Sequence, residues 1–322
     1  MITATRMLYL YVETPLHAGV GSGLSSIDLP IQRERPTQYP MIQGSGIKGK
    51  LRATAEDAKD PKDGKRIFSD GEVDILFGPS AISGKASEHA GALSVGDARI
   101  LLFPVRSLNG VFAFTTSCDV LSRFRRDLER MRPDAELSWR IPGKIPNGTA
   151  LVTQKISSEV CVDAADGSKI VLEEFTFTAQ ESDIVDEIAG WIAKEAIPEK
   201  YSYWREKLMN SLVILPNSDF RDFVLYSTEI VTRVKLERAT KTVGEGPWTE
   251  EHLPTDTLLY VPIYATNSRK KDDDRQADAI LEKATLLETR QSGYIQFGGD
   301  ETVGHGIVRI HWEIVNLPNK KE

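Results

Sequence analysis

The chain has 322 residues, 40% of them hydrophobic, and a formal net charge of −7. This length allows one elaborated domain or two, and the apolar content is sufficient for a sizeable core. The acidic balance argues against a protein coated in basic charge, but a local basic groove for nucleic acid is compatible with it.

The sequence shows no sign of a membrane or secretory segment. No apolar run approaches the roughly 20 residues that span a bilayer. The N-terminal stretch MITATRMLYLYVETP lacks a hydrophobic region of signal-peptide length with a cleavage site after it. We therefore expect a soluble cytoplasmic protein with no membrane partner. Cys118 and Cys161 have no metal-ligand spacing, and we expect free thiols in that compartment.

The first part of the chain is predicted to alternate between strands, loops and helices. A strand over 6–14 leads into the glycine- and serine-rich loop 17–26 and the polar run 28–40. Ser45 is a plausible N-cap for a helix, because apolar side chains then recur with helical spacing. That buried stripe comprises Ile47, Leu51, Thr54, Ala55 and Ala58. The next predictions are a short helix or turn at 72–78, paired strands at 92–105 and 110–116, and a helix at 118–131. The inward face of that helix comprises Val120, Leu121, Phe124, Leu128 and Met131.

The second part continues in the same mixed manner. The predicted elements are a helix at 184–197, a buried strand at 211–216, strands at 226–237 and 256–265, a helix at 272–288, and a strand–turn–strand unit at 292–315. The charge run 269–275 is predicted to be a solvated loop. Because strands and helices do not alternate strictly, the pattern favours an α+β fold with antiparallel pairing.

The stretch PMIQGSGIKGKLR matches two nucleotide motifs in part. Gly44, Gly46 and Gly49 spell G-x-G-x-x-G, but no proper strand precedes them and no βαβ unit surrounds them. Lys50 completes most of a phosphate loop, yet Leu51 stands where that motif needs Ser or Thr to hold Mg²⁺. The residues therefore disfavour a nucleotide-dependent enzyme.

Both motifs share one physical feature that this stretch retains. A glycine-rich turn opens a helix, so that backbone N–H groups and the positive end of the dipole face outward. Lys48 and Arg52 lie four residues apart and share one flank, while Lys50 projects on the other side. Gly49 lies opposite the apolar stripe and would let a ligand approach. A phosphate fits this arrangement, and a capped helix with solvated lysines explains it equally well.

Three stretches resemble the repeat-associated RNA-binding (RAMP) superfamily. TPLHAGVGSG resembles its N-terminal motif, in which a strand ends before a histidine and a glycine-rich loop. GGDETVGHGIVRI resembles its C-terminal glycine-rich loop. IDLPIQRERPTQYPMIQGSGIKGKLR is similar to the backbone subunit of type III-B CRISPR effector complexes, which cleaves target RNA. The D-x-P-I-Q-R-E run is the specific part of the match.

The resemblance implies an α+β fold with a ferredoxin-like (RRM-related) palm, an inserted helical region and a long β-hairpin thumb. On this basis we expect a single elaborated domain over 1–322. Its expected segments are the catalytic loop 17–43, the insertions and helical region 60–220, the thumb hairpin 230–262 and the glycine-rich loop 298–306.

The resemblance also implies partners. These are a CRISPR guide RNA, a target RNA and further copies of the chain in a helical filament. Other RAMP subunits, a large polymerase-like subunit and a small helical subunit would complete the complex. Each copy would cut the target RNA once, so that cleavage occurs at regular intervals.

Asp28 matches the catalytic aspartate of the family. One carboxylate on a loop could hold a divalent cation, Mg²⁺ or Mn²⁺, with water and phosphate oxygens, and help a ribose 2′-OH attack its phosphate. Without the resemblance, an Asp before Leu-Pro is usually a turn residue. His17 could contact RNA or assist proton transfer, or it is a structural histidine at a strand end. Glu229 is a further suggested helper near the base of the thumb.

The resemblance assigns RNA contacts to two glycine-rich regions. The guide backbone would contact Gln43, Gly44, Ser45, Gly46, Lys48, Lys50 and Arg52. A second loop could approach the RNA or the helix closely because of its glycines, which are Gly298, Gly299, Gly304 and Gly306. Phosphate contacts carry no sequence information, which suits a subunit that accepts any guide.

The thumb is predicted from an alternating pattern. Ile230, Thr232, Val234 and Leu236 form one face, and the opposite face includes Arg233 and Lys235. We expect the return strand at 256–265. The long connection carries Lys241 and Trp248. A protruding hairpin with apolar residues could wedge between base pairs and displace a nucleotide, and we expect Arg233, Lys235 and Trp248 to contact RNA. Packing of Trp248 on its own domain is the alternative.

Two alternatives remain within the family. One is a catalytically inert RNA-binding filament subunit, which the presence of Asp28 in the matching motif disfavours. The other is a standalone guide-processing RAMP endonuclease, which typically relies on a different arrangement, often with histidine.

Overall fold

The computed structural model describes residues 2–23, 26–80, 88–133, 136–154, 159–289 and 292–313. Parts of three predicted segments lie outside the described residues. Positions 24–25 belong to the glycine-rich loop, and 314–315 belong to the last strand unit. Within the expected insertions at 60–220, positions 81–87, 134–135 and 155–158 are outside the described residues. None of the described helices is long and apolar enough to cross a membrane.

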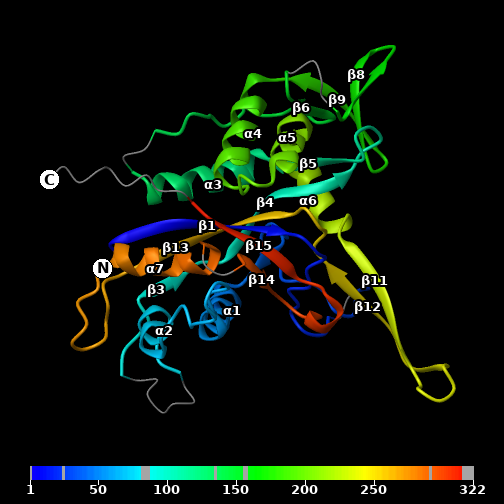
Figure 1. Ribbon diagram of the computed structural model, residues 1–322. Helices are drawn as coiled ribbons and strands as arrows, with labels where there is room; N and C mark the ends of the chain where they lie inside the picture. Colours follow the sequence, from blue (N-terminus) through cyan, green and yellow to red (C-terminus); the bar gives the residue numbers. More distant parts are fainter. Residues whose placement is uncertain are drawn as a thin grey trace.

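Most of the strands pair into one large, strongly curved sheet (Figure 1). Its order is β14–β15–β1–β13–β4–β5–β10–β6–β9–β8–β7, with β2 beside β4 and β3 beside β13. One half contains β1 (Ala4–Val12), β2 (Met41–Ile42), β3 (Leu93–Val95), β4 (Ala98–Arg106), β13 (Leu258–Ala265), β14 (Tyr294–Gln296) and β15 (Ile307–Trp312). The other half contains β5 (Phe112–Ser117), β6 (Thr149–Val152), β7 (Cys161–Ala164), β8 (Gly167–Leu172), β9 (Phe175–Glu181) and β10 (Leu212–Leu215).

Strand β1 lies inside the first half of the sheet, where it pairs antiparallel with β13 on one side and β15 on the other. Strand β13 pairs antiparallel with β4 in turn. Parallel pairing occurs in the distant half, between β5 and β10 and between β6 and β9. The predicted strand 92–105 is two strands, because Gly96 turns the chain and its N–H donates to the carbonyl of Pro262 at 2.9 Å.

Helices cover both faces of the central strands. They are α1 (Gly44–Asp57), α2 (Asp70–Phe77), α3 (Cys118–Met131), α4 (Asp183–Glu195), α5 (Ser202–Ser211), α6 (Asn217–Tyr226) and α7 (Ala277–Thr289). In Figure 1, α1, α2 and α7 lie below β1, while α3, α4 and α5 lie above it. The predicted mixed α+β class and the predominantly antiparallel pairing of β1 are confirmed.

The predicted inward face of α3 is confirmed by an aromatic cluster. The ring of Phe124 lies 4.9 Å from Tyr260, 6.3 Å from Tyr9 and 5.6 Å from Trp191. Trp139 stacks on it at 6.2 Å. Each such ring pair adds roughly 0.5–1.5 kcal/mol beyond the burial of area. The cluster therefore fixes α3 against β1 and β13, which form the platform of the site.

The hairpin consists of β11 (Glu229–Leu236) and β12 (Val243–His252), a separate two-stranded sheet that projects from the body (Figure 1). The prediction that 256–265 is its return strand is wrong, because that segment is β13 in the centre of the main sheet. Its nearly continuous apolar residues suit a strand buried on both faces. The true return strand is largely exposed at its tip and carries glycine, proline and charge, so its sequence has no strand pattern.

Candidate functional site

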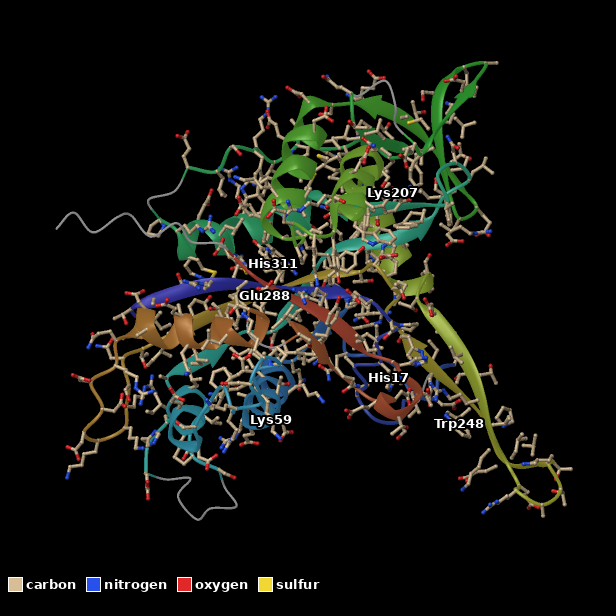
Figure 2. All side chains as sticks on the ribbon, viewed as in Figure 1. His17, Lys59, Lys207, Trp248, Glu288 and His311 are labelled. Atoms are coloured by element: carbon tan, nitrogen blue, oxygen red, sulfur yellow. The ribbon has the colours of Figure 1, made fainter. Side chains whose placement is uncertain are left out.

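Three segments that are far apart in the sequence meet at the base of the hairpin. The segment around His17 and the segment around Asp28 both bond to the second half of β12. The loop 298–306 bonds to the His17 segment and to side chains of the hairpin. In Figure 2, His17 lies at the base of the hairpin and Trp248 lies along it. The fold thus brings the N-terminal, central and C-terminal motifs to one place.

Asp28 is exposed, and its carboxylate is held by a single residue of β12. Its Oδ2 accepts hydrogen bonds from the backbone N–H of Thr249 at 2.8 Å and from the Thr249 hydroxyl at 2.9 Å. The backbone N–H of Asp28 donates to the same hydroxyl oxygen at 3.0 Å. The N–H and hydroxyl bonds from Thr249 hold the pKa of Asp28 below its usual value. The carboxylate is therefore ionised at neutral pH and has a fixed direction.

The segment that carries Asp28 is fastened to β12 through a buried carboxylate. Arg33 forms an ion pair with Glu251, whose side chain is 2% exposed. Glu251 also accepts hydrogen bonds from the N–H of Ile31 at 3.0 Å and from the hydroxyl of Thr228 at 2.9 Å. A buried charge that is satisfied this fully fixes the position of the chain around it. The arginine of the D-x-P-I-Q-R-E run therefore positions the aspartate of the same run.

His17 is half-buried and bonded to the same strand. Its Nδ1 lies 2.7 Å from the backbone carbonyl of Glu251. Because a carbonyl only accepts, Nδ1 carries the proton and Nε2 is the nitrogen with a lone pair in the neutral ring. The ring lies 5.5 Å from the ring of His252. The bond from Nδ1 attaches His17 to β12, which is a structural role. Nε2 remains for the expected contact with RNA or proton transfer.

The loop 298–306 packs against the backbone of the His17 segment. The N–H of Gly299 donates to the carbonyl of His17 at 2.9 Å. A Cβ on Gly298, whose φ is +78°, would lie 2.2 Å from that same carbonyl oxygen. A side chain cannot be placed there without moving the backbone. Gly298 and Gly299 therefore let the loop lie close to the backbone of the His17 segment.

Charged side chains from the hairpin and the loop form a cluster beside His17. Arg233 donates through Nη2 to Asp300 Oδ2 at 2.9 Å, and its Nε lies 2.6 Å from Glu250 Oε2. His252, which is fully buried, has its Nε2 3.5 Å from Asp300 Oδ2, and His305 has its Nδ1 4.0 Å from the same oxygen. Burial lowers the pKa of His252. Partial burial acts to raise the pKa of Asp300, but the charge of Arg233 and the hydrogen bonds with Glu250 and His252 together outweigh it, and the pKa is lowered.

Glu229 stands at the first position of β11, directly opposite His252 in the hairpin register. Burial raises the pKa of Glu229, and the nearby His305 partly opposes this. The residue therefore belongs to the rim of the cluster. The structure shows no hydrogen bond from the described residues to its carboxylate.

Helix α1 begins at Gly44, so the predicted N-cap at Ser45 is wrong. Gln43 occupies the N-cap position, and its side chain makes no capping bond. Instead, Asp97 accepts a hydrogen bond from the N–H of Gly44 at 2.8 Å and satisfies part of the helix N-terminus. The strand before the helix is the two-residue β2, which runs antiparallel to β4. This excludes the βαβ unit that dinucleotide binding requires, as the sequence indicated.

The basic residues of α1 are not equivalent. Lys48 donates to the carbonyl of Leu93 at 2.9 Å, and Arg52 pairs with Glu56 at 2.8 Å and also reaches Asp74. Both side chains are bonded within the chain, so the predicted joint phosphate-binding flank is not formed in this structure.

The opposite side of α1 is open. A Cβ on Gly46 or Gly49 would meet no atom within 4 Å. Gln43 and Ser45 are exposed, and Lys50 is half-buried with its Nζ 3.9 Å from Glu301. This contact joins the helix loosely to the loop 298–306, so the exposed face of α1 continues toward the cluster.

On β11 the apolar face is exposed and the face with Arg233 points toward the body, which is the reverse of a strand in a protein core. The apolar side chains of Ile230, Val234 and Leu236 are 47%, 44% and 53% exposed, whereas Arg233 is turned toward the body. Lys235 pairs with Glu245 across the hairpin at 3.0 Å. The face predicted to be apolar therefore exists, and it is available for a partner.

Trp248 is half-buried on the hairpin itself. Its indole N–H donates to Glu250 Oε1 at 2.8 Å, and a Cβ on Gly246 would lie 2.9 Å from the ring. The structure thus shows the packed arrangement that was the alternative to a free wedge.

Sequence reasoning missed several residues of this site. Thr249, His252, Asp300 and His305 were given no role, although Asp300 and His305 stand inside the quoted GGDETVGHG motif. The run TEEH at 249–252 falls in the long connection that was expected between the two thumb strands. A polar residue at every position of that run is a signal that could have marked it, since a connection needs no such concentration of carboxylates and histidine.

The expected cation at Asp28 can be tested against the donors around it. Oδ2 is engaged by Thr249, and among the described residues Asp28 belongs to no group of three or more closely spaced histidine, cysteine or carboxylate ligands. Mg²⁺ is often held by one or two carboxylates together with substrate phosphates and water. Asp28 fits this mode as a single protein ligand, and it does not form a dedicated cation site.

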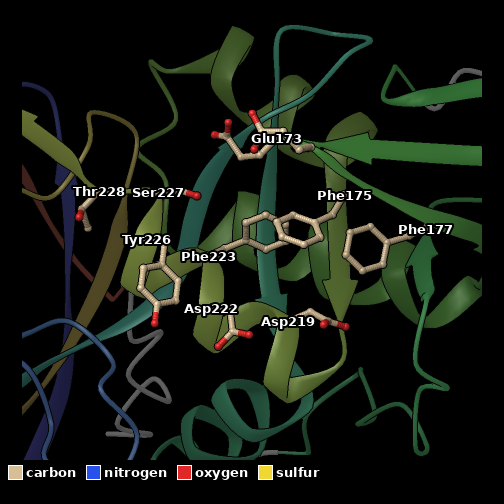
Figure 3. A pocket seen from close by; sticks show the side chains of 10 residues that line it. Glu173, Phe175, Phe177, Asp219, Asp222, Phe223, Tyr226, Ser227 and Thr228 are labelled. Atoms are coloured by element: carbon tan, nitrogen blue, oxygen red, sulfur yellow. The ribbon is translucent and has the colours of Figure 1, made fainter.

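A groove of about 550 Å³ lies between β9 and α6, and Thr228, which donates to Glu251, is among the residues that line it (Figure 3). The rings of Phe175 and Phe223 meet in it at 5.8 Å. Its rim carries the carboxylates of Glu173, Asp219 and Asp222. This charge has the wrong sign for a nucleic-acid backbone, so the groove is not part of the candidate site.

Comparison with known proteins gives consistent results. The family model described as the RAMP superfamily matches residues 9–309. The chain is 39% identical over 305 residues to the CRISPR system Cmr endoribonuclease Cmr4 of Pyrococcus furiosus, covering 94% of this chain and 93% of the relative. It is 26% identical to the CRISPR system CMR subunit Cmr4 of Saccharolobus solfataricus, covering 96% and 97%.

The fold agrees as well. The chain is similar to the crystal structure of oligomeric Cmr4 from Pyrococcus furiosus, with a TM-score of 0.70 and 32% identity over 96% of this chain and 98% of that one. The similarity therefore spans the whole site, from the His17 segment to the loop 298–306.

Proposed function

The chain belongs to the RAMP superfamily, and we propose that it is the RNA-cleaving backbone subunit of a type III-B CRISPR ribonucleoprotein. Its endoribonuclease activity follows from the relative that is 39% identical over 94% of the chain. One observation in the structure carries the proposal. Asp28 is presented to solvent as a fixed, ionised carboxylate at the junction of the three motif-bearing segments.

The proposed reaction is attack of a ribose 2′-oxygen on the adjacent phosphorus. This forms a 2′,3′-cyclic phosphate and breaks the bond to the 5′-oxygen of the next nucleotide. Asp28 would accept a hydrogen bond from the attacking hydroxyl and orient it. Nε2 of His17 is a candidate to take the proton of that hydroxyl, and the 5′-oxygen that leaves would take a proton from water. A divalent cation, Mg²⁺ or Mn²⁺, held by Asp28 with phosphate oxygens, would neutralise charge on the phosphate.

The guide RNA is proposed to lie along the open side of α1. This surface includes Gln43, Ser45, Gly46, Gly49 and Lys50, and a polynucleotide can approach the helix closely over its two exposed glycines. Lys48 and Arg52 would join only if they exchanged their present partners for phosphates. Contacts of this kind hold the backbone and leave the bases free to pair with a target.

The target RNA is proposed to run beneath the hairpin. The exposed apolar side chains of Ile230, Val234 and Leu236 supply a surface that could displace a base and leave its linkage unstacked. Lys241, at the tip, would meet the backbone of the RNA or of a neighbour. Displacement of one nucleotide by each copy would give cuts at regular intervals.

The palm is proposed to be ferredoxin-like. In support, β1, α1, β4, β13, α7 and β15 follow one another as a βαββαβ series, and their strands stand in the order β15–β1–β13–β4. All three pairings are antiparallel. The remaining strands and helices, mostly from 60–220, would be insertions into this palm.

Further copies of the chain are the first proposed protein partners, in line with the oligomeric state named for the structure that is 32% identical. Other RAMP subunits, a large polymerase-like subunit and a small helical subunit are proposed to complete the complex in the cytoplasm. If the chain proved not to cleave RNA, the alternative would be a catalytically inert filament subunit.

The test is cleavage of target RNA by the assembled complex containing Asp28→Asn. We expect guide and target binding to be unchanged and cleavage to be abolished, because the amide removes the negative charge but retains the shape. Asp166→Asn is a matched control, since Asp166 is also exposed and its ion pair with Lys169 also lowers its pKa. Undiminished cleavage by Asp28→Asn would remove the assignment.

A further inference from the structure

We infer that His252, Asp300 and His305 form a binding site for a transition-metal cation of the zinc class, which joins the hairpin to the loop 298–306. The donor atoms of these three residues all lie within 4.8 Å of one another. The inference concerns residues that have no part in the proposed cleavage. It does not depend on whether Asp28 is catalytic.

The distances suit a compact tetrahedral ion. Metal–ligand bonds of about 2.0–2.1 Å place neighbouring ligand atoms roughly 3.3 Å apart in a zinc site. Asp300 Oδ2 is already 3.5 Å from His252 Nε2 and 4.0 Å from His305 Nδ1. Glu250 Oε2 borders the group, at 3.9 Å from His252 Nε2. Because all three donors lie within 4.8 Å of one another, contraction by at most about 1.5 Å would bring them to the spacing of a zinc site.

The donor types select the class of metal. Two imidazole nitrogens with carboxylate oxygens suit zinc and its neighbours, whereas Mg²⁺ and Ca²⁺ prefer oxygen ligands only. The ring of His252 is fully buried and its Nε2 faces Asp300, so the neutral form of the ring can offer that lone pair to a metal. Asp300 and His305 are 22% and 24% exposed, so an ion can enter from the side of the loop.

Both elements that supply the ligands are held rigidly. His252 ends β12 and pairs with Glu229 in the hairpin register. The loop is fixed on the neighbouring chain segment by hydrogen bonds from Gly299 N–H to His17 and from Gly306 N–H to Pro15, both of 2.9 Å. Ligands on pre-arranged elements lose little entropy on binding, which is a requirement for a selective metal site.

Arg233 is a competitor built into the site. Its Nη2 donates to Asp300 Oδ2 at 2.9 Å and lies 3.4 Å from His305 Nδ1, so the guanidinium stands where a cation would enter. A positive charge at this distance opposes a second cation. Removal of Arg233 should therefore strengthen metal binding, whereas removal of a true ligand should abolish it. These opposite effects separate a metal site from a simple network of ion pairs.

The experiment uses the full-length chain without RNA, titrated with Co²⁺ as a spectroscopic probe and then with Zn²⁺. We expect one equivalent of Co²⁺ to give the visible absorption of a tetrahedral ion, and Zn²⁺ to displace it. Arg233→Gln should bind at least about tenfold more tightly, since one repulsive charge at close range is lost. His305→Ala and Asp300→Asn should each lose the signal.

Two controls make the result specific. His89→Ala removes a histidine that lies outside the cluster and should leave the titration unchanged. Asp28→Asn should also bind the metal normally, so failure of this inference and failure of the proposed cleavage can be told apart. Melting curves without metal establish that each variant is folded. The inference is overturned if neither the natural chain nor Arg233→Gln binds Co²⁺ stoichiometrically, or if folded His305→Ala gives the same spectrum.

Discussion

At the scale of single residues, Thr249 determines how Asp28 is presented. Its N–H and hydroxyl both donate to one carboxylate oxygen, and these bonds are the cause of the lowered pKa of Asp28. The two residues are separated by 221 positions in the sequence. Sequence reasoning identified Asp28 through the motif around it. It could not identify Thr249, because only the folding of the segment onto β12 brings the hydroxyl to the carboxylate.

The substitution Thr249→Val tests this relation. The hydroxyl bond is lost while shape and β-branching are kept, so the carboxylate should move and its pKa should rise toward the usual value. Misplacement of a reacting group by ~1 Å can cost about 100-fold in rate, and we expect a loss of about 10-fold or more. Because the ionised form is the active one, the acid limb of the pH–rate profile should shift to higher pH.

Thr176→Val is the matched control for that measurement. Thr176 is an exposed threonine in a strand, β9, and it belongs to none of the segments that form the candidate site. It should cleave target RNA with the natural rate and pH profile. If Thr249→Val kept both as well, Thr249 would have no role in positioning Asp28.

At the scale of elements, the loop 298–306 depends on close contact with the His17 segment. Gly298 and Gly304 have nearly equal φ angles, +78° and +79°, so alanine strains the backbone similarly at both. Only at Gly298 would the added Cβ also clash, at 2.2 Å from the carbonyl oxygen of His17, whereas at Gly304 it meets nothing within 4 Å. A comparison of the two alanine variants therefore separates the effect of the clash with His17 from the effect of backbone strain.

We expect Gly304→Ala to lower the free energy of unfolding by about 1 kcal/mol, the usual cost of a left-handed alanine. Gly298→Ala should cost at least about 3 kcal/mol, because the loop must also move away from His17. Thermal unfolding followed by circular dichroism gives the comparison. Equal melting temperatures for the two variants would show that the contact with His17 contributes nothing to stability.

The elements show where sequence patterns are sufficient and where they fail. Helix α3 was predicted with its bounds and its buried face, because its apolar side chains recur with the helical period. The return strand of the hairpin was misplaced, since β12 gains its structure from pairing with β11 and from the segments that dock on it. Its own residues, which include three glutamates and two glycines, have no strand periodicity.

At the scale of the whole molecule, the site exists only in the folded chain. The carboxylate comes from the segment after β1, its support from the hairpin, and the adjoining cluster from the loop before β15. The resemblance predicted RNA contacts for the N-terminal and C-terminal glycine-rich motifs. It could not predict that Arg33 and Glu251 hold the Asp28 segment on the hairpin, or that Lys48 and Arg52 are bonded within the body.

The parts of the site are linked one to the next. Lys50 of α1 lies 3.9 Å from Glu301 of the loop 298–306, and that loop is bonded to the hairpin through Arg233. The hairpin in turn holds Asp28 through Thr249. We propose that an RNA duplex bound along α1 continues to the carboxylate at the hairpin. In a filament, each copy would repeat the same contact, and the spacing of the cuts would be the spacing of the copies.

The most direct test is a structure of the assembled complex with guide RNA and a target RNA in which the scissile nucleotide lacks its 2′-hydroxyl. Without that hydroxyl the target cannot be cleaved by this route, so the complex is held before reaction. The account predicts that the carboxylate of Asp28 lies within roughly 5 Å of one target phosphate in each copy, a distance that one water or cation can bridge. A complex in which Asp28 is remote from every target phosphate would contradict it.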